Sequence, residues 1–204
     1  MRKELAALSM ILLAGCATSP KTKFYTLSVT PSGSQHQMKI PFPVQLAAVH
    51  IPPLLDRERM VRATGTNRVV ISETERWSAP FDEMVRNVLA RDLAALLPDG
   101  SVILPRAPAP AGIGTLVVTI VQFGPDATDE VKLSCSWALL QGDTETPVLE
   151  RDFHFDAGPA ATTDATVEAM SRCLERLASD IVSTLSNTSI SISNPSSHRH
   201  RGQD

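Results

Sequence analysis

Residues 80–97 read PFDEMVRNVLARDLAALL, and this stretch decides most of what can be said about the fold. Pro80 suits the first turn of a helix, and the two acidic residues that follow Phe81 complement the positive end of a helix dipole. Pro98-Asp99-Gly100 then stops the pattern. Apolar side chains recur on one face at helical spacing: Phe81, Met84, Val85, Val88, Leu89, Leu93 and Leu96. The stretch therefore predicts an amphipathic helix that must cover an apolar surface.

A second helix is predicted over 162–185. Thr162 or Thr163 can cap its first turn, because a threonine hydroxyl accepts a hydrogen bond from a free amide there. Its apolar stripe consists of Val167, Met170, Cys173, Leu174, Leu177, Ile181 and Leu185.

Alternating or short apolar segments between and before the helices predict strands. In 131–140, every second side chain is apolar, which is typical of a half-buried strand. Thr64-Gly65-Thr66-Asn67 is a turn of hairpin length. Strands are expected at 24–29, 44–51, 60–63, 68–72, 102–104, 115–123, 131–140 and 148–155.

These elements predict an α/β (α+β) fold in a single domain, with a mixed, mostly antiparallel sheet and two long amphipathic helices. Both apolar stripes are satisfied when the helices pack on the sheet. The formal net charge of −3 provides no basic patch, so nucleic acid is not an expected partner.

The first fifteen residues have the composition of a bacterial signal peptide. Arg2 and Lys3 precede an apolar run from Leu5 to Leu13, which is too short to cross a hydrocarbon core of about 30 Å. Leu13-Ala14-Gly15-Cys16 resembles the lipobox, and this resemblance implies a diacylglyceryl thioether on Cys16 followed by cleavage before it. The alternative is an ordinary signal peptide with an incidental cysteine. Ala17-Thr18 in place of an aspartate favours the outer membrane, on its periplasmic face.

The chain is therefore divided into four parts. We expect a signal peptide at 1–15, a lipidated tether at 16–23, the folded domain at 24–187 and a disordered polar tail at 188–204. Several acyl chains anchor a protein without any membrane-spanning helix.

Two further cysteines, Cys135 and Cys173, lie on the apolar faces of their predicted elements. An oxidising periplasm permits a disulfide between them. Two buried free thiols are the alternative, because unpaired cysteine is among the most buried residue types.

No sequence motif for nucleophilic catalysis or phosphate binding is present. Asp152, His154 and Asp156 share one face of a predicted strand and could hold a metal ion or serve a hydrolase. A solvated strand face explains them better, since a zinc site needs a closed and oriented ligand set. His198 and His200 are a weaker metal signal still. We predict neither a metal site nor an enzyme.

Several short motifs, in their order along the chain, resemble the PqiC-type family of auxiliary lipoproteins of ABC-type and MCE-type intermembrane transport systems. They are Phe24-Tyr25-Thr26-Leu27, Ile51-Pro52, Leu55-Asp56-Arg57, Val61-Arg62, Arg76-Trp77-Ser78-Ala79-Pro80, Phe123, the strand Leu133 to Trp137, Ala169-Met170-Ser171 and Leu177-Ala178. The polar tail is a departure from that pattern.

The resemblance implies an outer-membrane lipoprotein without catalytic activity, an accessory subunit of lipid transport that contributes to membrane integrity. It implies an MCE-domain protein with its inner-membrane permease as partners, a homo-oligomer, and no cofactor beyond the acyl groups on Cys16. Assistance in assembling another envelope complex, for secretion or export, is the alternative function.

Five residues are candidates for a protein interface: Leu55, Asp56, Arg57, Arg76 and Trp77. Aromatic residues and arginine are favoured in the cores of protein contacts. Trp77 could instead pack the start of the helix against the sheet. Asp56, Arg57 and Arg62 could form a structural ion pair, and Leu54-Leu55 an exposed apolar loop that meets lipid or a partner.

Overall fold

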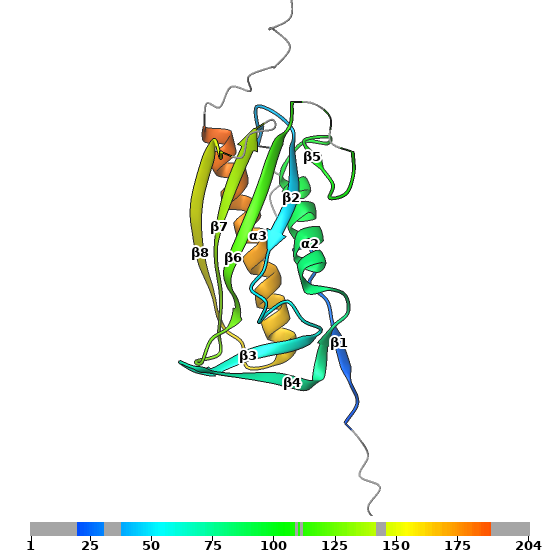
Figure 1. Ribbon diagram of the computed structural model, residues 1–204, viewed down its shortest axis with the longest axis vertical. Coiled ribbons are helices and arrows are strands. Elements are labelled where there is room, and N and C mark those ends of the chain that lie inside the picture. Colours follow the sequence, from blue (N-terminus) through cyan, green and yellow to red (C-terminus); the bar gives the residue numbers. More distant parts are fainter. Residues whose placement is uncertain (1–19, 31–37, 109, 111, 142–145, 189–204) are drawn as a thin grey trace, which may run out of the picture.

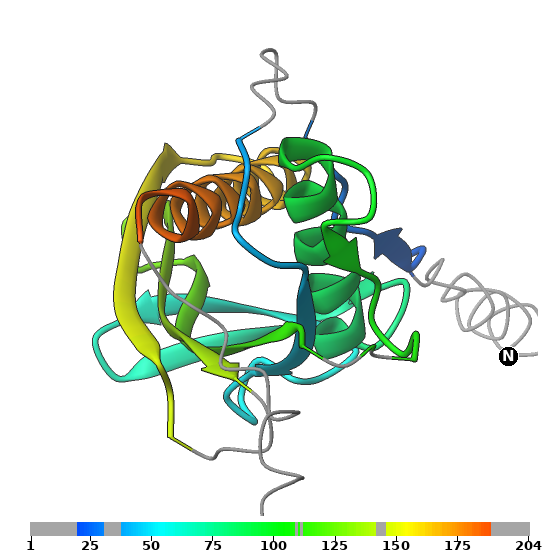
Figure 2. The same ribbon diagram turned by 90° about the horizontal axis from the view of Figure 1, so that it is seen from above.

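The computed structural model describes residues 20–30, 38–108, 110, 112–141 and 146–188. Eight strands and two helices are arranged in them as two sheets with both helices on one side (Figures 1 and 2). In chain order they are β1 (Lys23–Tyr25), β2 (Val44–His50), β3 (Arg59–Gly65), β4 (Arg68–Trp77), α2 (Phe81–Leu96), β5 (Val102–Ile103), β6 (Gly114–Pro125), β7 (Glu130–Gln141), β8 (Leu149–Pro159) and α3 (Thr163–Asn187).

Both predicted helices are confirmed, and their apolar stripes are buried. Helix α2 begins directly after Pro80 and has Asp82 and Glu83 in its first turn. Helix α3 is capped by Thr162, whose hydroxyl accepts a hydrogen bond of 3.2 Å from the amide of Ala165. The two helices pack beside each other against the same face of the larger sheet (Figure 2). The α+β class is therefore confirmed.

The larger sheet has five strands in the order β5-β2-β6-β7-β8. Strand β2 runs parallel to both β5 and β6, whereas β6, β7 and β8 form two long antiparallel ladders. In β7 the predicted alternation holds: the side chains of Val131, Leu133, Cys135, Trp137 and Leu139 are buried under the helices. Trp137 donates a hydrogen bond of 3.3 Å from Nε1 to Asp180 on α3, which attaches this helix to the sheet.

The remaining strands form a second, three-stranded sheet in the order β1-β4-β3, whereas the sequence suggested a single sheet. Pro52 and Pro53 follow β2 and cannot donate ladder hydrogen bonds, so the chain turns before β3 instead of extending the larger sheet. The β3–β4 hairpin crosses one end of the larger sheet (Figure 1). Strand β4 continues to Trp77, beyond its expected end, because β1 pairs with it in parallel from Glu75 to Trp77.

The first strand is shorter than predicted. Sequence alternation suggested 24–29, but β1 ends at Tyr25, and the chain then turns into the junction of the two helices. Leu27 is buried there, and its amide donates a hydrogen bond of 3.1 Å to the sulfur of Met84 on α2. The amide of Ser28 donates one of 3.2 Å to the hydroxyl of Ser171 on α3. These helix contacts replace the sheet ladder that the pattern predicted.

Candidate functional site

The end of β4 and the start of α2 build the wall between two hollows. Trp77 is 6% exposed and stacks on Phe81, with ring centroids 4.7 Å apart, and Phe81 in turn stacks on Phe123 of β6 at 5.8 Å. The amide of Trp77 donates a hydrogen bond of 2.7 Å to the carbonyl of Glu58. This packing agrees with the alternative in which Trp77 holds the start of the helix against the sheet.

The first hollow, here called the outer hollow, lies between β1, the loop before β3 and the start of α2, and has a volume of about 430 Å³. It brings together four of the five candidate interface residues: Asp56, Arg57, Arg76 and Trp77. Arg76 forms an ion pair of 3.5 Å with Glu58, and Phe24, 66% exposed, borders the same hollow.

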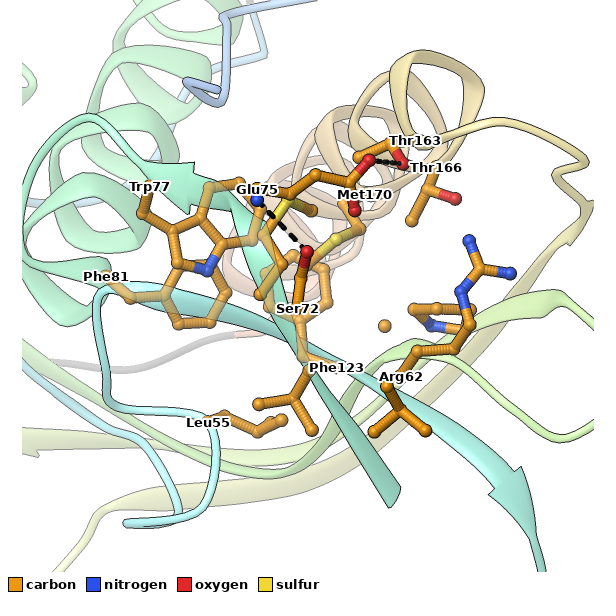
Figure 3. A pocket seen from close by; sticks show the side chains of 15 residues that line it. Leu55, Arg62, Ser72, Glu75, Trp77, Phe81, Phe123, Thr163, Thr166 and Met170 are labelled. Carbon is orange, nitrogen blue, oxygen red and sulfur yellow. Dashed lines mark hydrogen bonds between the residues drawn. The ribbon is translucent and has the colours of Figure 1, made fainter. Parts of the chain in front are cut away.

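The second hollow, the inner pocket, lies on the other side of Trp77 beneath the β3–β4 hairpin (Figure 3). Its volume is about 160 Å³, similar to cavities of about 150 Å³ that admit benzene. Its apolar wall is formed mainly by Leu55, Met60, Trp77, Phe81, Phe123 and Met170. Leu55 therefore lies in this pocket with Trp77, which lines both hollows, whereas Asp56, Arg57 and Arg76 line only the outer hollow.

Polar groups border the inner pocket at the start of α3. The hydroxyl of Thr163 donates a hydrogen bond of 2.6 Å to Oε1 of Glu75, and the amide of Glu75 donates one of 3.0 Å to the hydroxyl of Ser72 (Figure 3). Arg62 also lines the pocket, and its guanidinium pairs with Asp129. Apolar walls with these few polar groups suit the binding of a small apolar group.

The partner of Arg62 belongs to a tightly bonded turn between β6 and β7. Asp126 accepts hydrogen bonds from the amide and hydroxyl of Thr128 at 2.8 and 2.7 Å, and Lys132 lies 2.8 Å from it. The ammonium of Lys132, followed by the Thr128 bonds, holds the pKa of Asp126 well below its usual range. This turn presents Asp129 to the hairpin, so Arg62 connects the two sheets instead of pairing with Asp56.

The strand-face residues considered for metal binding or hydrolysis remain spread along β8. Asp152, His154 and Asp156 are exposed, and Nδ1 of His154 lies 3.1 Å from the hydroxyl of Ser134. Within the part of the chain that the structure describes, no three His, Cys, Asp or Glu side chains are grouped to hold a metal ion. Cys16, His198 and His200 lie outside the described residues.

Cys135 and Cys173 are both buried free thiols, which decides between the two alternatives for this pair. Burial raises the pKa of each thiol to about 12. Neither sulfur is therefore a thiolate near neutral pH, and neither is suited to nucleophilic chemistry.

Some residues of the site were not found by sequence reasoning. Glu58 reaches the outer hollow from the loop before β3, Met60 reaches the inner pocket from β3, and Met170, noted only in an apolar stripe and a motif, reaches it from α3. Only the tertiary fold brings these residues together. Phe24 and Phe123 were noted only as parts of motifs. Among the described residues, no helix has the length and apolar character needed to cross a bilayer.

Comparison with known proteins agrees with this fold. A family model for the ABC-type transport auxiliary lipoprotein component matches residues 25–182. Over 141 residues the chain is 30% identical to the intermembrane transport lipoprotein PqiC of Escherichia coli strain K12, covering 68% of this chain and 74% of that protein. PqiC of Shigella flexneri matches with the same values.

Two crystal structures share the fold. The first, of an uncharacterized protein, has a TM-score of 0.67 at 20% identity and covers 81% of this chain and 99% of its own. The second, XCC0632 from Xanthomonas campestris, has a TM-score of 0.61 at 17% identity and covers 80% and 95%. The chain thus folds as a small α+β domain with two hollows on either side of Trp77. The chain belongs to the family of ABC-type transport auxiliary lipoprotein components.

Proposed function

We propose that this chain is a non-catalytic accessory subunit of an MCE/ABC-type intermembrane lipid transport system, anchored in the outer membrane and facing the periplasm. The family match and the similarity to a protein named as an intermembrane transport lipoprotein support the transport role. Its partners would be an MCE-domain protein with its inner-membrane permease, and further copies of this chain. Such a subunit contributes to membrane integrity by binding and positioning, without a cofactor.

The anchor in this proposal is a diacylglyceryl thioether on Cys16. Leu13-Ala14-Gly15-Cys16 and the apolar run before it support this modification, and Ala17-Thr18 supports the outer membrane. Mass spectrometry of the protein from native membranes tests it. The expected first residue is an acylated Cys16, and Cys16→Ala should release the protein from membranes. An unmodified thiol in the native protein would contradict the anchor.

The single observation that carries the docking role is the outer hollow. It joins an exposed aromatic ring, Phe24, to the guanidinium groups of Arg57 and Arg76 beside the buried indole of Trp77. Aromatic and arginine side chains are enriched at the centres of protein interfaces and contribute most of their binding energy. We therefore assign the outer hollow to the contact with the transport partner.

A photo-crosslinking amino acid at position 57 tests this contact in intact cells. The expected product joins the chain to an MCE-domain protein, identified by mass spectrometry. Glu168, on the exposed side of α3, is the matched control position and should give no such product. A product with a secretion or export component would favour the alternative function, and equal yields at both positions would remove the outer hollow from the interface.

A further inference from the structure

Exposed apolar side chains are concentrated at one end of the molecule. Among the described residues, eight large apolar side chains are exposed, and Phe24, one of them, borders the outer hollow. Leu104 and Val148 lie at the end of the larger sheet where β5 pairs with β2 and β8 begins. The other five, here called the apolar end, are Leu54, Val69, Val70, Ile71 and Val121.

Three members of the apolar end line one groove. Leu54 comes from the loop before β3, Val69 from β4 and Val121 from β6, and they are 43%, 41% and 71% exposed. Pro125, the last residue of β6, also lines the groove and places it at the end of the larger sheet that the hairpin crosses. Contiguous apolar surface of this kind usually marks a contact with a partner or a membrane.

An anchor at Cys16 would place this end near the bilayer. Lys23 begins β1, which belongs to the same small sheet as Val69, Val70 and Ile71 (Figure 1). Cys16 precedes Lys23 by seven residues, so a fully extended chain separates them by at most about 25 Å. A domain on so short a tether can bring its apolar end to the membrane surface, whereas Leu104 and Val148 lie at the far end of the larger sheet.

We propose that the apolar end faces the bilayer and that Leu54, Val69 and Val121 contact its interfacial region. This inference rests on the proposed lipid anchor at Cys16. Transfer of apolar side chains out of water stabilises the contact by about 25 cal/mol per Å² buried. The exposed charged side chains of the small sheet are three basic ones, Lys23, Arg59 and Arg68, and one acidic one, Glu73, so attraction to anionic lipid headgroups adds to the apolar contact. The acylated chain is thus oriented by the hairpin as well as held by its lipid.

Depth-dependent quenching in vesicles tests the orientation. Acylated full-length Val69→Cys, Val121→Cys and Val148→Cys variants are labelled with an environment-sensitive fluorophore and reconstituted in phosphatidylethanolamine/phosphatidylglycerol vesicles that carry nitroxide-labelled lipid. The buried thiols of Cys135 and Cys173 should not react, so they can remain in place. Val148, 45% exposed, matches Val69 in exposure and serves as the control.

The expected result is a blue shift and loss of most of the fluorescence at positions 69 and 121, with neither change at position 148. Vesicles of pure phosphatidylcholine should give the same pattern with smaller changes, because the apolar contact remains while the attraction of the basic side chains to anionic headgroups is lost. Equal quenching at all three positions, or none at 69 and 121, would overturn the proposal. The proposal would also be overturned if position 69 were shielded from a water-soluble quencher in native envelopes but not quenched by lipid nitroxides. That result would assign the groove to a protein partner.

Flotation of the wild-type protein separates this inference from the proposed function. If the acylated protein does not float with vesicles, or if Cys16→Ala floats equally well, the anchor itself fails. If the wild type floats and Cys16→Ala does not, the anchor stands, and the quenching at positions 69 and 121 decides the orientation alone. Circular dichroism of each labelled variant confirms that it is folded.

Discussion

The hydroxyl of Thr163 donates a hydrogen bond of 2.6 Å to the carboxylate of Glu75, joining the first residue of α3 to the small sheet. The two residues are 88 positions apart in the sequence. This bond and the Arg62–Asp129 ion pair are the polar connections that hold the hairpin over the inner pocket.

Thr163→Val should therefore destabilise the protein by about 1.5–3 kcal/mol, the usual range for a hydrogen bond to a charged group. Urea denaturation measures the change. Thr119→Val, at an exposed position on β6, is the control and should stay within about 0.5 kcal/mol of wild type. Equal stability of the two variants would show that the Glu75 bond contributes nothing to the fold.

Removing the cap of α3 is a separate test of the same region. Thr162→Ala leaves the amide of Ala165 without its acceptor, and it should cost about 1 kcal/mol in the free energy of unfolding. Thr162→Asn should retain most of the stability, because asparagine also caps. If both variants lose the same amount, the hydroxyl is not acting as a cap.

The burial of Asp92 predicts an unusual pH dependence of the free energy of unfolding. It is 2% exposed on α2, and neither carboxylate oxygen has a hydrogen-bond partner within 3.5 Å in the described structure. Burial raises the pKa of Asp92 to about 7; the backbone of Thr30 opposes this shift, and the charge of Glu175 reinforces it.

Between pH 4 and 7 the folded protein therefore holds a proton that the unfolded chain has lost, and the contribution of Asp92 to the free energy of unfolding falls as pH rises through this range. Asp92→Asn should remove this slope and be more stable than wild type at pH 8. Urea denaturation at pH 5 and pH 8 measures both effects. Asp99→Asn, at an exposed loop position, should keep the wild-type slope. The prediction would be contradicted if, between pH 5 and pH 8, the free energy of unfolding of the wild type rose relative to that of Asp92→Asn.

Gly114 is required for close packing where β6 begins. A Cβ atom there would lie 2.7 Å from Cε2 of Phe42 and 2.8 Å from Cδ1 of Leu139. Gly114→Ala should therefore destabilise the protein by about 1–3 kcal/mol, measured by thermal unfolding. Gly65→Ala is the matched control, because its Cβ would meet nothing closer than Cβ of Arg68 at 4.0 Å. Similar melting temperatures for the two variants would refute the packing argument.

The buried thiols should be unreactive in the native state. Cys135 and Cys173 should not react with an aromatic disulfide reagent at pH 8 until denaturant is added, because burial keeps both sulfurs protonated and inaccessible. Unfolding should then release both thiols without any reductant. Release only after reduction would show a disulfide between them.

The local elements of this protein follow from its sequence alone. The 3.6-residue period over 80–97 and 162–185 and the two-residue period over 131–140 are properties of neighbouring side chains, so both helices and strand β7 could be predicted with nearly correct ends. The grouping of Asp56, Arg57, Arg76 and Trp77 as one site was likewise suggested by short motifs, and the outer hollow contains all four.

The assembly of these elements was decided by contacts between distant segments. The division into two sheets, the parallel pairing of β1 with β4 and the turn of Leu27 into the helix junction depend on partners more than fifty residues away. Leu55 was separated from Asp56, Arg57 and Arg76, and Asp92 was buried, for the same reason. Periodicity indicates which side of an element is apolar, but the burial of a particular side chain depends on which other segments of the chain pack against it.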